Sequence, residues 1–215
     1  MTSGFFRIGP GVEADFDADE AQAVALVVAQ VAGLVQAEAA AAGLPVEAEL
    51  LDGRPRPSGV AEDEHAAGGD ITDAYLAELT GLDAVPPPRP QDPALARLFP
   101  DGYADDPEAA AELRRLTHSS LRALKIDNAA TVLDGLPLGG GRVRLDADGS
   151  RAWMLALNDA RLVLGTRLDL TDDTDLVAEL DEAVATDPTG PRVLAISLYQ
   201  FLSFLLETLI NAMDR

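Results

Sequence analysis

Apolar residues recur at helical spacing over four long segments, and this pattern limits the chain to a core of packed helices. The segments are residues 18–42, 107–134, 147–165 and 191–213. Hydrophobic residues make up 47% of the chain, but aromatic residues make up only 5%. The core must therefore consist mainly of Ala, Leu and Val, which favours close-packed helices over an aromatic-rich β-sandwich.

The last segment, 191–213, has the widest apolar arc, which covers about half of the helix circumference. Such an arc is typical of the central helix of a bundle or of an oligomer interface. We expect a helical bundle around a central C-terminal helix that the other three long helices contact. Phe204 lies on the opposite, polar edge of this helix. It is a candidate interface anchor, so a homodimer is a second expectation.

Short β segments flank this helical pattern. Residues 5–8 and 12–16 enclose Gly9, Pro10 and Gly11, which is typical of a β-hairpin. The sequence GRVRL at 141–145 predicts a further short strand that could pair with the hairpin. The expected fold class is therefore mainly α, with a small appendage of a β-hairpin or three strands.

Polar residues mark where the helices begin. Asp17 stands three residues before Glu20, which resembles a capping box, and Asp106 and Asp146 are the expected N-caps of later helices. Gly165 is the expected left-handed C-cap of the helix that starts after Asp146.

The chain is expected to be a single helical domain, 1–215, interrupted by an insertion at 44–92. Gly, Pro, Glu and Asp dominate this insertion. Its composition predicts a mobile acidic segment with one short helix near 72–80. A shorter acidic helix is expected at 172–186.

The net charge of −21 results from 37 acidic residues against 16 basic ones. Binding of DNA needs a cationic face that replaces phosphate counterions, so a nucleic-acid partner is not expected. The chain has no cysteine, which excludes disulfides and thiolate metal sites within it. The N-terminus lacks a secretory pattern, and the longest apolar run, 193–206, is shorter than a membrane span. We therefore expect a cytoplasmic protein without a membrane partner.

Asp159 raises the main chemical question of the sequence. Its helical neighbours are apolar: Leu155, Leu162 and Val163. A buried carboxylate without a partner would cost several kcal/mol, so we expect an arginine from 107–134, or Arg167, to bind it. The pair would then fix the register of two helices. The alternative is a catalytic carboxylate with a raised pKa. No histidine or second carboxylate lies within helical reach of Asp159, which disfavours that alternative.

Two segments carry a family resemblance: AWMLALNDARLVLGTRL at 152–168 and LFPDGYADDPEAAAELRRLTHSSLR at 98–122. They resemble an actinobacterial domain-of-unknown-function family, the one numbered twenty-seventeen. The matching positions are Trp153, Asn158, Asp159, Arg161, Gly165, Thr166 and Arg167, together with Arg114, Arg115 and Thr117. The next family position is usually acidic, and here it is His118.

The resemblance covers nearly the whole chain except 44–92. It implies no established activity. Members of the family often lie in gene neighbourhoods with the Clp protease adaptor, and some carry a transcriptional regulator label. The resemblance therefore points to regulation, either near proteolysis or in transcription.

Patterns typical of metal, nucleotide and nucleophile sites do not fit the chain. The acidic run at 169–175 fails as a calcium loop, because Thr174 and Leu180 stand where an EF-hand needs Gly and Glu. His65 is a lone histidine among acids, which is a weak metal site. No P-loop and no Gly-x-Ser-x-Gly elbow is present. We expect no metal, no cofactor and no catalytic residue.

The sequence therefore favours a non-enzymatic regulatory or adaptor-type protein that acts through an unknown protein partner and is linked to regulated proteolysis. One alternative is a transcriptional regulator. Another is a small-molecule hydrolase or sensor that uses Asn158, Asp159 and Arg161. The candidate cluster, as a structural or a functional site, consists of Arg114, Arg115, Arg122, Trp153, Asn158, Asp159, Arg161, Thr166 and Arg167.

Overall fold

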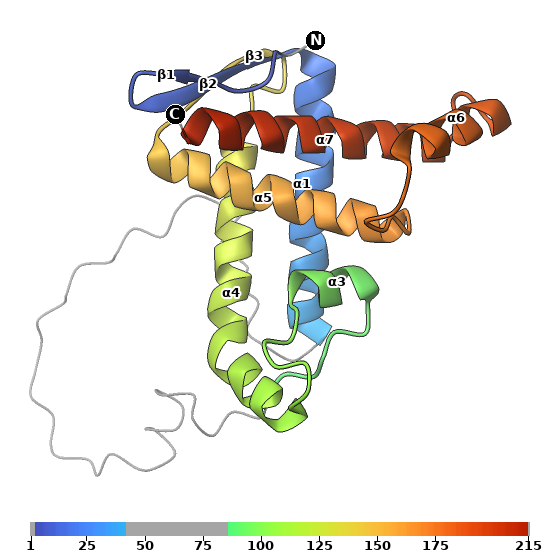
Figure 1. Ribbon diagram of the computed structural model, residues 1–215. Helices are drawn as coiled ribbons and strands as arrows, with labels where there is room; N and C mark the ends of the chain where they lie inside the picture. Colours follow the sequence, from blue (N-terminus) through green and yellow to red (C-terminus); the bar gives the residue numbers. More distant parts are fainter. Residues whose placement is uncertain (1–2, 42–85, 215) are drawn as a thin grey trace, which may run out of the picture.

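The structure is a computed structural model that describes residues 3–41 and 86–214, and it consists mainly of helices with one small sheet (Figure 1). The fold class expected from the sequence is confirmed. The helices are α1 (Ala18–Ala41), α3 (Pro93–Leu98), α4 (Pro107–Gly135), α5 (Ala147–Arg167), α6 (Leu176–Thr186) and α7 (Pro191–Met213). Residues 44–85 of the expected acidic insertion lie outside the described residues, and so does the helix expected near 72–80.

Three antiparallel strands form the sheet in the order β1 (Phe6–Ile8), β2 (Gly11–Phe16) and β3 (Gly141–Leu145). The hairpin turn contains Gly9, whose φ of 57° is a conformation that glycine adopts without steric cost. On β2, Val12, Ala14 and Phe16 are buried. Their side chains alternate with those of Glu13 and Asp15, so one face of the sheet packs on the helices.

The predicted capping residues begin their helices as expected. The Asp17 backbone N–H donates to Glu20 Oε2 at 2.9 Å, and the Glu20 N–H donates to Asp17 Oδ1 at 2.9 Å. Asp106 and Asp146 each accept a hydrogen bond from a backbone N–H in the first turn of α4 and α5. These side chains satisfy N–H groups that have no partner within their helix.

Gly165 does not cap α5, so that prediction is wrong. The helix continues to Arg167, and the left-handed residue is Asp169, with a φ of 57°. A Cβ on Gly165 would lie 3.1 Å from Tyr199 Cε2. The glycine therefore permits close packing of α5 on α7, a requirement that the sequence pattern of a C-cap does not reveal.

α3 was not predicted from the sequence, because its N-cap residue, Asp92, was counted as part of the acidic insertion. Asp92 accepts hydrogen bonds from the N–H groups of Ala94 and Leu95, and Pro93 occupies the first position of the helix. α3 packs against α5. α6 begins at Leu176, later than the expected residue 172.

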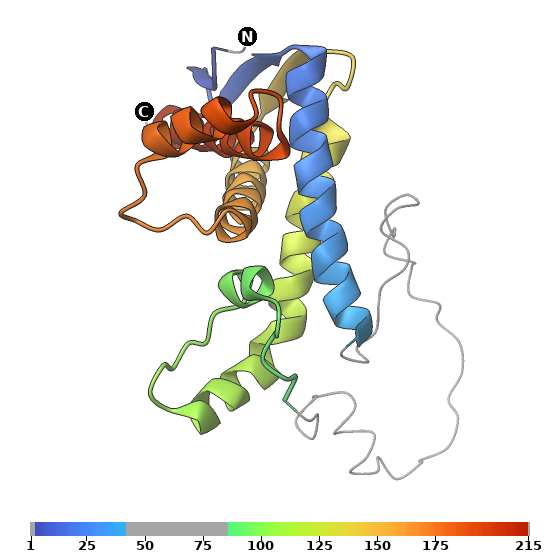
Figure 2. The same ribbon diagram turned by 90° about the vertical axis from the view of Figure 1, so that its right-hand side faces the viewer.

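The long helices form two crossed pairs (Figures 1 and 2). α1 and α4 lie side by side and run in opposite directions, and α5 and α7 form a second antiparallel pair that crosses them. α5 contacts α1, α3, α4, α7 and the sheet, whereas the main contacts of α7 are with α5, α6, β1 and β2. The helix at the centre of the fold is therefore α5, and not the C-terminal helix that the width of its apolar arc had favoured.

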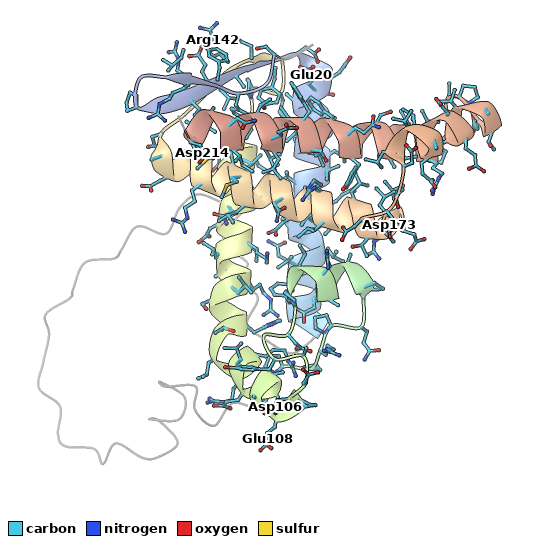
Figure 3. All side chains as sticks on the ribbon, viewed as in Figure 1. Glu20, Asp106, Glu108, Arg142, Asp173 and Asp214 are labelled. Carbon is cyan, nitrogen blue, oxygen red and sulfur yellow. The ribbon has the colours of Figure 1, made fainter. Side chains whose placement is uncertain are left out.

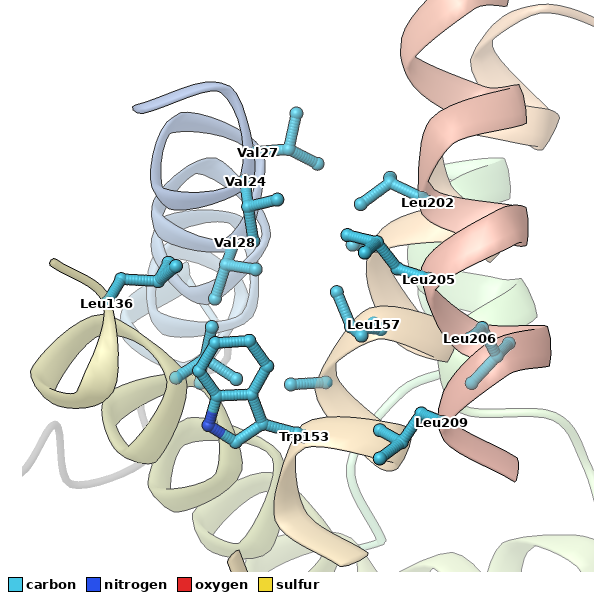
Figure 4. Close-up of a cluster of buried hydrophobic side chains, with 14 of the residues drawn as sticks. Val24, Val27, Val28, Leu136, Trp153, Leu157, Leu202, Leu205, Leu206 and Leu209 are labelled. Atoms are coloured by element: carbon cyan, nitrogen blue, oxygen red, sulfur yellow. The ribbon is translucent and has the colours of Figure 1, made fainter. Parts of the chain in front are cut away.

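Trp153 and Leu157 of α5 fill the space between the two helix pairs (Figure 4). Both are fully buried, as are Leu202, Leu205 and Leu209 of α7. Figure 4 shows these leucines facing the valines of α1 across the core. The apolar arc of α7 is thus used inside the fold from Leu202 onward, whereas Leu194 is 65% exposed.

Two helices are long and apolar enough to cross a membrane by length and composition alone, Ala18–Glu38 and Pro191–Met213. The apolar run at 193–206 is shorter than a membrane span, but the helix that contains it is longer. Core helices meet the same two criteria, and both segments contribute buried residues to the core. The cytoplasmic location stays a prediction.

Phe204 lies on α7 and is 40% exposed. As an interface anchor, it would make the wild-type chain scatter light as a dimer and the Phe204→Glu variant as a monomer, because a carboxylate opposes burial between copies. Leu138→Glu is the control, since Leu138 is 53% exposed in a loop. A monomeric wild type would contradict the anchor.

Candidate functional site

Asp159 forms a buried ion pair with Lys125 that joins α5 to α4. Lys125 Nζ donates to Asp159 Oδ1 at 2.8 Å and to Oδ2 at 2.9 Å. Asp159 is only 7% exposed. Lys125 Nζ also lies 5.8 Å from the centre of the Phe99 ring. Both carboxylate oxygens are therefore engaged by a cation from the neighbouring helix.

The expected burial of Asp159 is correct, but the expected arginine partner is wrong. Lys125 provides the charge from within the expected segment, 107–134. It is the only lysine of the chain. Lys125 stands one helical turn before Ala129 and two before Val132, both of which are buried. This phase indicates burial, but Arg114 and Arg122 lie on the same face of α4, so it does not by itself identify the lysine as the partner.

The surroundings of the pair are apolar. A small cavity of about 10 Å³ borders it. Its remaining lining residues are Val28, Val31, Ala32, Val35, Ala129 and Ala156. Burial raises the pKa of Asp159 above its usual 3.8, and the hydrogen bonds and charge of Lys125 only partly oppose that rise. Desolvation thus opposes the charged form of Asp159 more than the lysine favours it.

A second buried polar group joins α1 to α4. Arg122 donates to Glu38 Oε2 at 2.6 Å, and His118 Nε2 lies 3.6 Å from the same oxygen. The His118 ring is 4.8 Å from the ring of Phe99 and is 4% exposed. Burial, and then the nearby charges of Arg122 and Arg114, lower the pKa of His118, while Glu38 opposes this effect. The folded protein therefore favours the neutral imidazole.

This lowered pKa predicts a loss of stability in mild acid. The unfolded chain binds a proton at His118 as the pH falls below 6.5, before the folded chain does. The contribution of His118 is thus complete above pH 6.5 and is lost as the pH falls through the folded pKa. Urea unfolding from about pH 7.5 to about pH 5.5 should show this slope in the wild type. The slope should be smaller in His118→Gln, and an equal slope would contradict the prediction.

The other arginines of the candidate cluster do not bind Asp159. Each binds a different carboxylate: Arg114 with Asp101, Arg115 with Glu112 and Arg167 with Asp92. Arg114 also donates to the backbone carbonyl of Pro87. The contacts of Arg114 and Arg167 hold the residues that precede α4 against α4 and α5. The structure does not assemble these arginines into one site.

The remaining cluster residues have separate surroundings. Trp153 is fully buried, with the Phe5 ring 5.7 Å away. The Thr166 hydroxyl donates to the Leu162 carbonyl at 2.8 Å. Arg161 donates to Asn158 Oδ1 at 3.4 Å, and its Nε is buried without a hydrogen-bond partner.

This arrangement does not resemble a catalytic site. Asp159 is enclosed by Lys125 and apolar side chains, so its carboxylate has no access to a substrate. Within residues 3–41 and 86–214, no group of three or more His, Cys, Asp or Glu side chains could hold a metal ion. Within the Asn158–Asp159–Arg161 segment, Asp159 is therefore buried in its pair with Lys125, whereas Arg161 is half-buried and hydrogen-bonded to Asn158.

Comparisons with known proteins connect the chain to regulators. The chain is 33% identical over 156 residues to the "Oxidative stress regulator AosR" of Mycobacterium tuberculosis (strain ATCC 25618 / H37Rv) and to that of Mycobacterium bovis. The match covers 63% of this chain and 64% of each relative. The "Putative oxidative stress regulator AosR" of Mycobacterium leprae is 33% identical over 153 residues, which are 64% of this chain and 66% of the relative. The chain thus spans less than two thirds of the length of these relatives.

No solved structure matches the fold significantly. A family model described as "Domain of unknown function (DUF2017)" matches residues 2–213. Its range includes both segments on which the resemblance was based, and it extends over the sheet, the helices and the buried Lys125–Asp159 pair. The chain belongs to the DUF2017 family.

Proposed function

We propose that this protein is a regulatory, adaptor-type protein that acts by binding another protein through the outer face of its sheet. The relatives are named as regulators. The buried charged residues of the candidate cluster are already paired inside the fold: Asp159 binds Lys125, and Arg122 binds Glu38. The sheet, in contrast, presents an accessible face of the composition found in protein interfaces.

The strand register defines this outer face. Phe6, Glu13 and Arg144 are paired across the three strands, and the alternation of side chains adds Ile8 and Arg142. Phe6 is 40% exposed and Ile8 is 49% exposed. Figure 3 shows Arg142 pointing away from the helices. Exposed aromatic and arginine side chains on one face are typical of interface hot spots.

Glu13 organises the centre of this outer face. It is 2% exposed, and its two carboxylate oxygens bind Arg142 Nε at 3.0 Å and Arg144 Nε at 2.6 Å. The side chains of both arginines remain half or more exposed. The buried carboxylate therefore fixes two guanidinium groups in advance, which reduces the entropy lost when a partner binds them.

A hollow of about 620 Å³ borders the outer face beside the hairpin turn. Ile8 and Pro10 line it on one side, and Arg144 and Ala147 line it on the other. The lining also contains Glu13, which binds Arg144, and Asp146. Its apolar residues and its mixed charges fit a partner surface that presents an apolar side chain next to polar groups. A link to regulated proteolysis would make such a partner a protease component or a substrate. The gene neighbourhoods of the family support that finer form of the proposal.

The observation that carries the proposal is the outer face, and paired variants test it. Phe6→Ser/Arg144→Glu changes the face, whereas Leu116→Ser/Arg151→Glu makes the same kinds of change at exposed residues on α4 and α5. Cross-linking in lysate of the source organism, followed by mass spectrometry, should identify a protein that the wild type and the control bind but the face variant does not. Equal capture by the face variant would contradict the proposal, provided that circular dichroism shows all three chains folded.

The named role of the relatives in oxidative stress limits the mechanism available to this chain. Its 215 residues contain no cysteine, so they can form neither a disulfide nor a sulfenic acid. A response to oxidants within these residues cannot use a thiol. The thiol oxidant diamide should therefore leave the purified chain unchanged.

Duplex DNA should not bind this protein tightly at physiological salt. The net charge of −21 repels the phosphate backbone, and Lys125 is buried in an ion pair. Fluorescence anisotropy with duplex DNA should show no saturable binding. Tight binding that weakens steeply with added salt would favour the transcriptional regulator instead.

A further inference from the structure

A second hollow, distinct from the sheet face, lies between α3, α5 and α7 and the turn that leads to α6. It has a volume of about 120 Å³. Arg97 of α3, Arg161 and Thr166 of α5, and Tyr199 of α7 contribute to its lining. The remaining lining residues are Leu162, Gly165, Leu170, Thr171 and Asp172. Figure 3 labels Asp173, the next residue in the turn, beside the C-terminal end of α5.

Arg97 and Arg161 differ from most arginines of this protein. Ion pairs with carboxylates engage Arg89, Arg114, Arg115, Arg122, Arg142, Arg144, Arg167 and Arg192. In a chain with 37 acidic residues and 16 basic ones, an arginine readily finds a carboxylate. Across the part of the chain that the structure describes, neither Arg97 nor Arg161 forms an ion pair. Two arginines without a carboxylate therefore line the same small hollow.

The polar groups of Arg161 are also incompletely satisfied. Its Nε is shielded from solvent and has no hydrogen-bond partner, and its one hydrogen bond, to Asn158, is long at 3.4 Å. A buried guanidinium N–H without a partner costs free energy. A ligand oxygen that accepts from this group would remove that cost.

Tyr199 of α7 lies against the backbone of α5 and lines the same hollow. Gly165 has no side chain, and a Cβ there would lie 3.1 Å from Tyr199 Cε2, so the tyrosine ring lies directly against the helix. Tyr199 lines the hollow together with the two arginines, and a tyrosine hydroxyl is a neutral hydrogen-bond donor. Arg161, Gly165 and Thr166 all belong to the family motif at 152–168. A ligand in this hollow would therefore give these three residues a binding role, whereas Asp159 of the same motif is buried in an ion pair.

We propose that this hollow binds the phosphate group of a small phosphorylated ligand, held by Arg97 and Arg161 and by the hydroxyl of Tyr199. Planar guanidinium groups bind phosphate oxygens with two parallel hydrogen bonds, which matches paired arginines better than single lysines. The volume suits one small anion, and the hollow opens to solvent, so the rest of a phosphate monoester would extend outward. The inference is independent of the proposed protein partner.

Asp172 also lines the hollow, and its negative charge should weaken the binding of an anion. Removal of this charge should therefore give a variant that binds phosphate more tightly. Asp172→Asn removes the repulsion and leaves the size of the side chain almost unchanged. The two arginines and Asp172 should therefore change phosphate affinity in opposite directions.

Isothermal titration calorimetry at constant ionic strength tests the proposal with inorganic phosphate and with a nucleoside 5′-monophosphate. Arg97→Gln and Arg161→Gln should each weaken binding about tenfold or more, the effect of one charge-assisted pair. Asp172→Asn should tighten binding several-fold. Arg151→Gln is the matched control, because Arg151 is an exposed arginine of the same helix and the substitution changes the net charge equally. This variant should bind as the wild type does.

Tighter binding of the monophosphate than of phosphate identifies a monoester as the ligand, and the reverse result identifies free phosphate. The inference is overturned if neither compound binds better than chloride at equal ionic strength. It is also overturned if Arg151→Gln loses as much affinity as Arg161→Gln. Arg97 is exposed, so its variant keeps the test valid even if Arg161→Gln fails to fold.

Discussion

Asp159→Ala should lower the free energy of unfolding by about 3–5 kcal/mol, the usual cost of removing one member of a buried ion pair. The substitution leaves the ammonium group of Lys125 between α1, α4 and α5 without its counter-charge. The side chain of Lys125 is only 15% exposed, so water replaces the carboxylate poorly. Urea denaturation measures the loss. Asp127→Ala is the control, because Asp127 is exposed on α4 and its removal should change stability by less than about 0.5 kcal/mol.

Replacing both members of the pair should restore most of that stability. Burial raises the pKa of Asp159 despite the two hydrogen bonds from Lys125, which indicates that desolvation outweighs their attraction. Lys125→Met/Asp159→Leu removes both desolvation costs and fills the same space with apolar groups. Buried pairs replaced in this way are often neutral or more stable by about 1–4 kcal/mol. A double variant as unstable as Asp159→Ala would show that the pair itself stabilises the fold.

Local rules predicted most of the secondary structure correctly. The Asp17–Glu20 capping box, the Gly9 hairpin and the Asp146 cap each depend on residues close in sequence, and each forms as expected. The errors arose where tertiary packing decides. Gly165 has the sequence context of a C-cap. In the structure it instead leaves space, because it has no side chain, for the ring of Tyr199 on another helix.

The candidate site was harder to predict for the same reason. The burial of Asp159 follows from its own helix, but its partner lies 34 residues away on α4. The sequence offered several arginines and one lysine there, and Arg114 and Arg122 share the helical face of Lys125. Only the way α4 packs against α5 places the lysine opposite Asp159. Arg122, in turn, binds Glu38 across the interface with α1, a pairing for which the sequence contains no local signal.

Glu38→Ala should also cost about 3–5 kcal/mol, because it leaves a buried guanidinium without a counter-charge. The side chains of Arg122 and Glu38 are 7% and 10% exposed, and their closest atoms are 2.6 Å apart. Glu207→Ala is the control, since it removes an exposed carboxylate from α7. A loss in Glu38→Ala no larger than in Glu207→Ala would show that solvent reaches Arg122.

The same variant should become more sensitive to acid. Glu38 is the neighbour that favours protonation of His118, so its removal should lower the folded pKa of His118 further. The unfolded pKa stays near its usual 6.5, and the gap between the two states widens. Stability should therefore fall more steeply in Glu38→Ala than in the wild type between about pH 7.5 and about pH 5.5. Adding His118→Gln to Glu38→Ala should remove the extra slope. If the slope persists in that double variant, a group other than His118 titrates at this interface.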